Sequence, residues 1–116
     1  MDTMISSDTI KDKFITEAIE HANALSEGDY RKANELHKKL HSLYNKAKGS
    51  NQADIFSELL TESDENVRLW AAIFTLKVFP EEAEKTLENL SNSTSITGLS
   101  AATTLELWKK GMLELL

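Results

Sequence analysis

Residues 64–80 read DENVRLWAAIFTLKVFP, and this stretch decides the fold. Only three polar residues interrupt its apolar run between positions 67 and 79, and they are Arg68, Thr75 and Lys77. A surface helix keeps a polar face, so a helix that is apolar on nearly every side must be covered by neighbours on several sides. The stretch therefore predicts a central helix that packs between other helices.

Apolar side chains recur at helical spacing on both sides of this stretch. They predict six helices, at about residues 10–25, 30–48, 53–61, 64–79, 80–90 and from 99 to the region of 111. No segment alternates as a strand does, and short loops make consecutive helices antiparallel neighbours. The sequence therefore predicts an all-α fold of about six helices in antiparallel hairpins, which form a short HEAT-like α-α superhelix.

Two of the outer helices carry an apolar stripe that we expect to be buried. The stripe of the first helix consists of Ile10, Phe14, Ala18, Ala22 and Leu25. The stripe of the last helix consists of Ala102, Leu105, Trp108 and Met112. Tyr30 is expected to begin the buried stripe of the second helix.

The chain has 116 residues, enough for one hydrophobic core. We expect a flexible N-terminus at residues 1–8 and a single HEAT-like domain at residues 9–116. No cysteine is present, which excludes disulfides and thiolate metal ligands. No secretory signal or membrane-spanning run is recognisable, so we expect a cytoplasmic protein that does not enter membranes.

Charge is distributed unevenly along the chain. Residues 1–50 hold eight acidic and eight basic side chains, whereas residues 51–116 hold eleven acidic against five basic ones, which gives the whole net charge of −6. Nucleic acid requires the opposite balance, because Lys and Arg supply the phosphate contacts. An acidic half is expected to repel nucleic acid and to attract a basic protein.

Several short motifs carry a resemblance to known families. The run Asp64-x-x-Val67-Arg68-x-x-Ala71-Ala72 is similar to the signature of HEAT-like repeats, and a shift of 30 residues aligns Ala71-Ala72 with Ala101-Ala102. In the HEAT-like signature the acid and the arginine belong to the turn between helices, and the alanines allow tight packing. The resemblance implies that Asp64 and Arg68 are structural and form an ion pair.

Three further motifs resemble a bacterial family of domains of unknown function, number two thousand and nineteen of that series. The motifs are Gly28-Asp29-Tyr30-Arg31-x-x-Asn34, Val67-Arg68-Leu69-Trp70-Ala71-Ala72 and Trp108-x-x-Gly111. The resemblance spans about residues 10–113 and implies a small HEAT-like helical domain. Because relatives of that family occur among immunity proteins of bacterial toxin systems, it also implies a toxin-binding role.

Catalytic and metal-binding chemistry are only weakly indicated. His37 and His41 share one helix face, as zinc-binding histidines do in HExxH helices, but Lys38 stands where that motif has its glutamate. A third ligand such as His21 or Glu35 would have to come from nearby, so we predict neither a metal nor another cofactor. No glycine-flanked nucleophile is present either, and we expect a protein that is not an enzyme.

Exposed acidic side chains are the best candidates for partner binding. Trp70 and Trp108 lie on apolar stripes and are expected to be structural. The predicted partner-binding set consists of Glu58, Glu62, Glu65, Glu81, Glu84 and Glu88. The sequence thus favours a protein-binding domain, and in its sharper form an immunity protein that neutralises a basic toxin, possibly a nuclease. The alternative is a general adaptor or scaffold without a toxin partner.

Overall fold

The computed structural model describes residues 7–49 and 54–113, which form six α-helices and one 3-10 helix. Their bounds are α1 Ser7–Ser26, α2 Tyr30–Gly49, α3 Ile55–Glu58, η1 Leu59–Thr61, α4 Glu65–Thr75, α5 Pro80–Ser91 and α6 Ile96–Lys109. No strand occurs in these two ranges, and the predicted all-α class is confirmed. The predicted flexible segment 1–8 lies mostly outside the described residues, but Ser7 and Asp8 already belong to α1.

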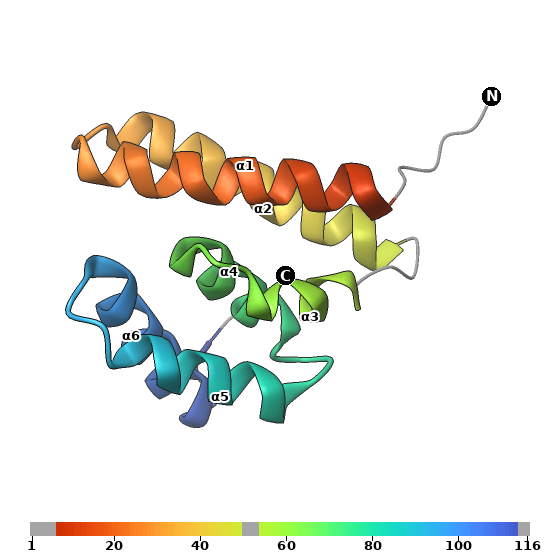
Figure 1. Cartoon of the computed structure of the whole chain (residues 1–116), viewed down its shortest axis with the longest axis vertical. Coiled ribbons are helices and arrows are strands. Elements are labelled where there is room, and N and C mark those ends of the chain that lie inside the picture. The colour runs from red at the N-terminus through yellow and green to blue at the C-terminus, as the bar shows by residue number, and fades with distance from the viewer. Residues whose placement is uncertain (1–6, 50–53, 114–116) are drawn as a thin grey trace.

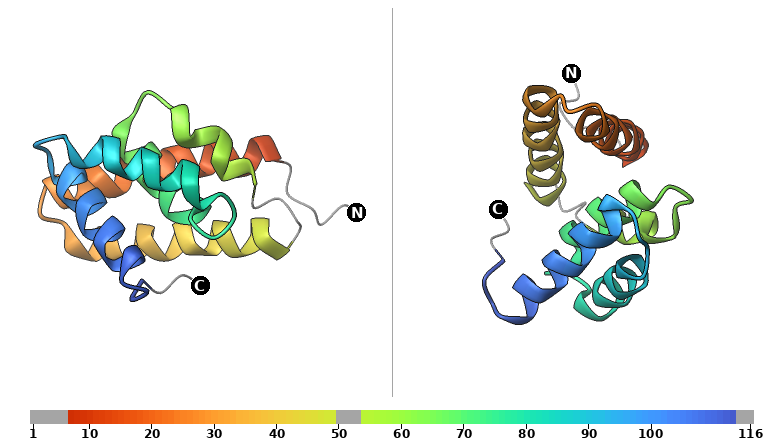
Figure 2. Two further views of the ribbon diagram at one scale, coloured as in Figure 1. Left: turned by 90° about the horizontal axis from the view of Figure 1, so that it is seen from below. Right: turned by 90° about the vertical axis from the view of Figure 1, so that its left-hand side faces the viewer.

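The helices form antiparallel hairpins in three layers (Figure 1). The first layer pairs α1 with α2, the middle layer contains α3, η1 and α4, and the last layer pairs α5 with α6. Helix α4 packs against α1 on one side and against α5 and α6 on the other. Figure 2 shows the two outer pairs on opposite sides of the middle layer. This arrangement is the predicted short α-α superhelix.

Helix α4 is the centre of the fold, as residues 64–80 predict. Every side chain from Leu69 to Leu76 is buried except that of Ile73, which is half-buried. The hydroxyl of Thr75 donates to the Ala71 carbonyl at 2.6 Å, so the one buried polar side chain of this helix has a partner. Neighbours on both sides therefore account for a helix that is apolar on nearly all of its circumference.

Aromatic rings join the first two layers. The ring of Phe14 on α1 lies 5.0 Å from that of Phe56 on α3 and 5.9 Å from that of Phe74 on α4, measured between ring centroids. Tyr44 on α2 stacks on Phe74 at 4.7 Å. Such offset and edge contacts add specific geometry to the area that the rings bury, so four helices are fixed around one point.

Local sequence features set the helix ends. A carboxylate oxygen of Asp64 accepts the backbone N–H of Asn66 at 2.8 Å and that of Val67 at 3.2 Å, which caps α4. Gly28 adopts a positive φ of 75° in the turn between α1 and α2, a conformation that glycine reaches without strain. Pro80 is the first residue of α5, where its missing N–H has no partner to lose.

The structure corrects several details of the predicted stripes. Tyr30 is 66% exposed, because it begins α2 at the hairpin end, where α4 no longer covers it. Ala24 is buried on α1, whereas Leu25, expected on the stripe, is only half-buried. On α6 the buried residues are Thr97, Gly98 and Ala101, whereas Ala102 is exposed, and Met112, which is also exposed, lies beyond the end of the helix.

Two predicted helices also differ, one in its division and one in its start. The third helix was expected at 53–61 as one segment, but its described part is a single turn of α-helix followed by η1. Helix α6 begins at Ile96 rather than near Leu99, because the Ser95 side chain accepts the N–H of Gly98 at 3.2 Å and caps the helix there.

Candidate functional site

The six glutamates predicted to bind a partner are divided among several elements. Glu81, Glu84 and Glu88 lie on α5, Glu58 ends α3, Glu62 follows η1, and Glu65 begins α4. Four of them have partners within the chain. Two form salt bridges: the Lys11 Nζ lies 3.0 Å from a carboxylate oxygen of Glu58, and the Lys109 Nζ lies 3.8 Å from one of Glu88. Two accept hydrogen bonds: the Ser95 hydroxyl donates to Glu65 at 2.7 Å, and the Trp108 indole N–H donates to Glu84 at 3.1 Å. Within the described residues Glu62 and Glu81 have no such partner, so their carboxylates are the most available for another molecule.

The four residues expected to be structural are found in different roles. Trp70 is 7% exposed and belongs to the core, while Trp108 is half-buried and packs against it. The predicted ion pair of Arg68 with Asp64 does not form, because the Asp64 carboxylate is turned toward the start of α4 as its cap. In the described part of the chain, the Arg68 Nε is buried without a hydrogen-bond partner.

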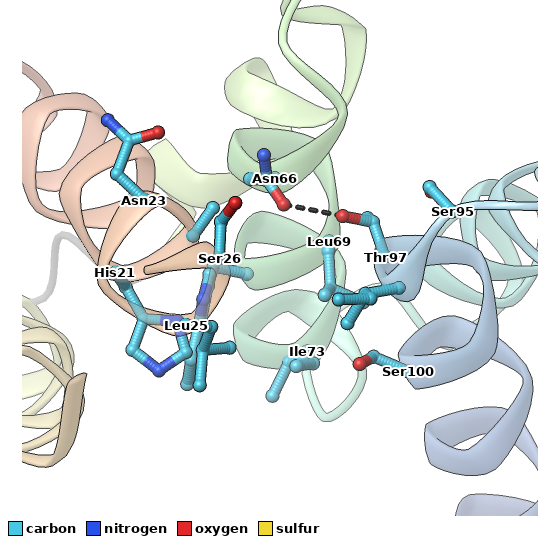
Figure 3. A pocket seen from close by; sticks show the side chains of 13 residues that line it. His21, Asn23, Leu25, Ser26, Asn66, Leu69, Ile73, Ser95, Thr97 and Ser100 are labelled. Carbon is cyan, nitrogen blue, oxygen red and sulfur yellow. Dashed lines mark hydrogen bonds between the residues drawn. The ribbon is translucent and has the colours of Figure 1, made fainter. Parts of the chain in front are cut away.

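A groove opens where the C-terminal end of α1, the middle of α4 and the start of α6 meet (Figure 3). Its volume is about 390 Å³, within the usual range of ligand sites. The lining residues are His21, Ala22, Asn23, Leu25, Ser26, Asn66, Leu69, Trp70, Ile73, Ser95, Ile96, Thr97 and Ser100. None of them is Asp, Glu, Lys or Arg, so the groove favours an uncharged group.

Hydrogen bonds between helices hold the polar side of the groove. The Thr97 hydroxyl donates to the Asn66 side-chain oxygen at 2.5 Å, and this bond joins α6 to α4 (Figure 3). At the edge of the groove Ile96 is 64% exposed, and Leu99 on the next turn is 70% exposed. The site thus combines a fixed polar wall with an unusually apolar edge.

All three histidines of the sequence gather around Trp70, and of the three only His21 lines the groove. The indole ring lies 5.3 Å from the ring of His21, 5.3 Å from that of His37 and 6.1 Å from that of His41, measured between ring centroids. Burial lowers the pKa of each imidazole, and the neighbouring His37 lowers the pKa of His21 and His41 further. The cluster is therefore neutral at pH 7.

The sequence contained partial signals for both features. A short turn at Gly28 makes α1 and α2 antiparallel, which brings His21 opposite His37, with their ring centroids 6.4 Å apart. The groove depends on the early start of α6. The sequence signal for that start is Ser95, which lies three residues before Gly98 and caps the helix. Because apolar periodicity places the start of the last helix near Leu99, the groove formed by its earlier start at Ile96 was not predicted.

Residues 7–49 and 54–113 contain neither a metal-binding group of three or more side chains nor a membrane-spanning helix. No three or more His, Asp or Glu side chains are arranged there to hold one ion. None of the helices in that part of the chain combines the length and hydrophobicity that crossing a membrane requires.

Comparison with known proteins identifies a similar fold. No family model matches the chain, and no curated protein matches it. The crystal structure of the protein RPA1889 from Rhodopseudomonas palustris superimposes with a TM-score of 0.87 over 98% of both chains, at 23% sequence identity. At this identity the likeness establishes the helical fold alone.

Proposed function

We propose that this chain is a non-catalytic protein-binding domain whose groove receives an uncharged segment of a basic partner protein. The observation that carries the proposal is the groove itself: a cavity of about 390 Å³ has no charged lining residue. Ile96 at its edge exposes a large apolar side chain, and Leu99, one turn further along α6 and outside the groove lining, continues this apolar surface, as binding surfaces do. Helical arrays of this kind commonly bind proteins through surfaces formed by successive hairpins.

Charge supports a basic partner. Residues 51–116 supply the whole net charge of −6, and within the described residues Glu62 and Glu81 have no partner of their own. An acidic surface accelerates encounter with a basic protein and disfavours acidic competitors. The apolar edge of the groove would then supply the affinity, and the surrounding charge would supply much of the association rate.

The sequence motifs that resemble a family with immunity-protein relatives favour a bacterial toxin as the partner. The chain would neutralise that toxin in the cytoplasm. A toxin domain that cleaves nucleic acid has to be basic to hold its substrate, and an acidic inhibitor is complementary to it. A general adaptor is the second form of the same function, in which several partners share one groove.

The polar contacts around the groove support the proposal of a non-catalytic role. Hydrolytic sites need a nucleophile whose hydroxyl or thiol lies within hydrogen-bond reach of a base. In the described part of the chain no serine hydroxyl bonds to a histidine, and Ser95 instead bonds to Ser93, Glu65 and the N–H of Gly98.

The test uses this chain and any basic protein that is encoded beside it in its genome. Calorimetry should give a one-to-one complex, and co-expression should protect cells from that protein if it is a toxin. Ile96→Ser and Leu99→Ser should each weaken binding at least about tenfold, as loss of an apolar anchor does. Met112→Ser is the matched control, because Met112 is 66% exposed but lies beyond the other end of α6.

Three outcomes separate the alternatives. If the Ile96 and Leu99 variants bind the partner as tightly as the Met112 variant does, the groove is excluded as the binding face. Several weak partners without protection would favour the adaptor over the immunity protein. Glu62→Lys and Glu81→Lys should slow association and reduce its salt dependence; unchanged rates would remove the role of charge.

A further inference from the structure

His37 and His41 are positioned as a pair on the outer part of the histidine cluster. They lie four residues apart on α2, their ring centroids are 4.5 Å apart, and their planes meet at 74°. The Nε2 atoms are 3.1 Å apart, so that one ring N–H donates to the unprotonated nitrogen of the other. Two nitrogens therefore share one proton at a position that faces away from the core.

We propose that His37 and His41 form a two-histidine site for a divalent transition-metal ion such as Zn²⁺, Ni²⁺ or Cu²⁺. The ring that carries its proton on Nε2 releases it to water and takes one up on Nδ1, so that both rings stay neutral and both Nε2 lone pairs are free for the ion. With metal–nitrogen bonds of about 2.0–2.1 Å, nitrogens 3.1 Å apart subtend roughly 95–102° at the metal. This angle lies between the octahedral and tetrahedral values. The distance between the two Nε2 atoms is therefore already that of two nitrogens bound to one ion, and each ring has only to turn until its lone pair points at the ion.

Surrounding rings hold this geometry. The ring of His37 lies 5.3 Å from that of Trp70, and the ring of His41 lies 5.3 Å from that of Phe74. The Nδ1 atom of His41 is buried, so Nε2 is the nitrogen that an ion from solvent can reach. Neutral imidazole is the form that binds metal, and burial already favours it in both residues.

The neighbouring lysines do not block the site. Lys38 and Lys39 follow His37 by about 100° and 200° around the helix, so their side chains leave α2 on other faces. His21 lies farther away, with its ring centroid 6.4 Å from that of His37. Since no three-ligand group occurs among the described residues, the site has two protein ligands and leaves the other positions to water or to a group of a partner.

The fluorescence of Trp70 can report metal binding at this site. Because Trp70 is in contact with both rings, bound Cu²⁺ should quench its fluorescence, whereas Zn²⁺ should bind without such quenching. The protein is used without an affinity tag and with Trp108→Phe, so that Trp70 is the only tryptophan. Calorimetry with ZnCl₂ and fluorescence with CuCl₂ at pH 7.5 should both give one saturable site per chain.

Variants decide whether the two histidines are the ligands. His37→Gln and His41→Gln keep side chains of similar polarity and should each weaken Zn²⁺ binding at least about tenfold, since even partners of ligands contribute that much. His21→Gln is the matched control in the same cluster and should bind as the parent does. Circular dichroism verifies that each variant is folded. Three results would overturn the proposal. The parent could show no saturable binding, the His37 and His41 variants could bind Zn²⁺ as tightly as the parent, or His21→Gln could lose as much affinity for Zn²⁺ as they do.

Discussion

The indole N–H of Trp108 donates to a carboxylate oxygen of Glu84 at 3.1 Å, and this bond joins the end of α6 to α5. Both side chains are half-buried, so the bond is partly shielded from water. Glu84 belongs to the acidic set predicted to bind a partner, but its carboxylate is already used within the chain. The pair therefore acts first as a fastening between the last two helices.

Loss of this bond should lower the free energy of unfolding. Glu84→Leu removes the acceptor and leaves the indole N–H without a partner, which should cost about 1 kcal/mol. Glu84→Gln retains an accepting oxygen and should cost clearly less. Urea denaturation measures both, and Glu81→Gln on the exposed face of the same helix should change stability by less than about 0.5 kcal/mol. Equal effects of all three variants would show that the bond contributes nothing.

The cap of α4 gives a second prediction. Asp64→Ala should lower the free energy of unfolding by about 1 kcal/mol, because two backbone N–H groups lose their acceptor. Asp64→Asn should retain most of the stabilisation, because its side-chain oxygen can still accept these bonds. Since Asp64 does not pair with Arg68, a double-mutant cycle with Arg68→Met should give a coupling energy below about 0.5 kcal/mol. A larger coupling energy would be evidence for the ion pair between Asp64 and Arg68 that the HEAT-like signature implies.

The start of α6 is sensitive to added volume. A Cβ at Gly98 would collide with the backbone carbonyl of Ser93, and backbone cannot rotate away as a side chain does. Gly98→Ala should therefore cost about 1–3 kcal/mol and distort the groove that α6 helps to form. Gly49→Ala is the control, because a Cβ at Gly49 meets nothing within 4 Å, and it should be neutral or slightly stabilising. A stable Gly98→Ala protein with full partner binding would contradict this.

How far the sequence predicts this molecule depends on whether a feature is local. The all-round apolar character of α4 and the short turn at Gly28 are local, and they predict the central helix and its antiparallel neighbours. The groove is not local, because it requires the exact start of α6 and the distance between two hairpins. The cluster around Trp70 likewise depends on register between helices, which periodicity alone leaves open.

The stability of the chain should carry a pH signature from Glu17. A carboxylate oxygen of Glu17 on α1 is buried without a hydrogen-bond partner. Burial raises its pKa above the ordinary value of 4.5, although Lys39 and Lys13 act in the opposite direction. Between pH 4.5 and the higher folded pKa, the folded state binds a proton that the unfolded state has released, so this group lowers the free energy of unfolding as pH rises.

Replacing Glu17 by glutamine removes that dependence. Below pH 4.5 the side chain is protonated in both states and resembles glutamine, so the variant and the parent should have nearly equal stability. Above that pH, Glu17→Gln should become the more stable protein, and its advantage should level off once the folded carboxyl is ionised. Urea denaturation from pH 4 to pH 8 measures this difference, and Asp12→Asn, at an exposed position of α1, controls for the loss of one charge from that helix. An advantage that is constant across this range, or that Asp12→Asn reproduces, would mean that burial of Glu17 is not its cause.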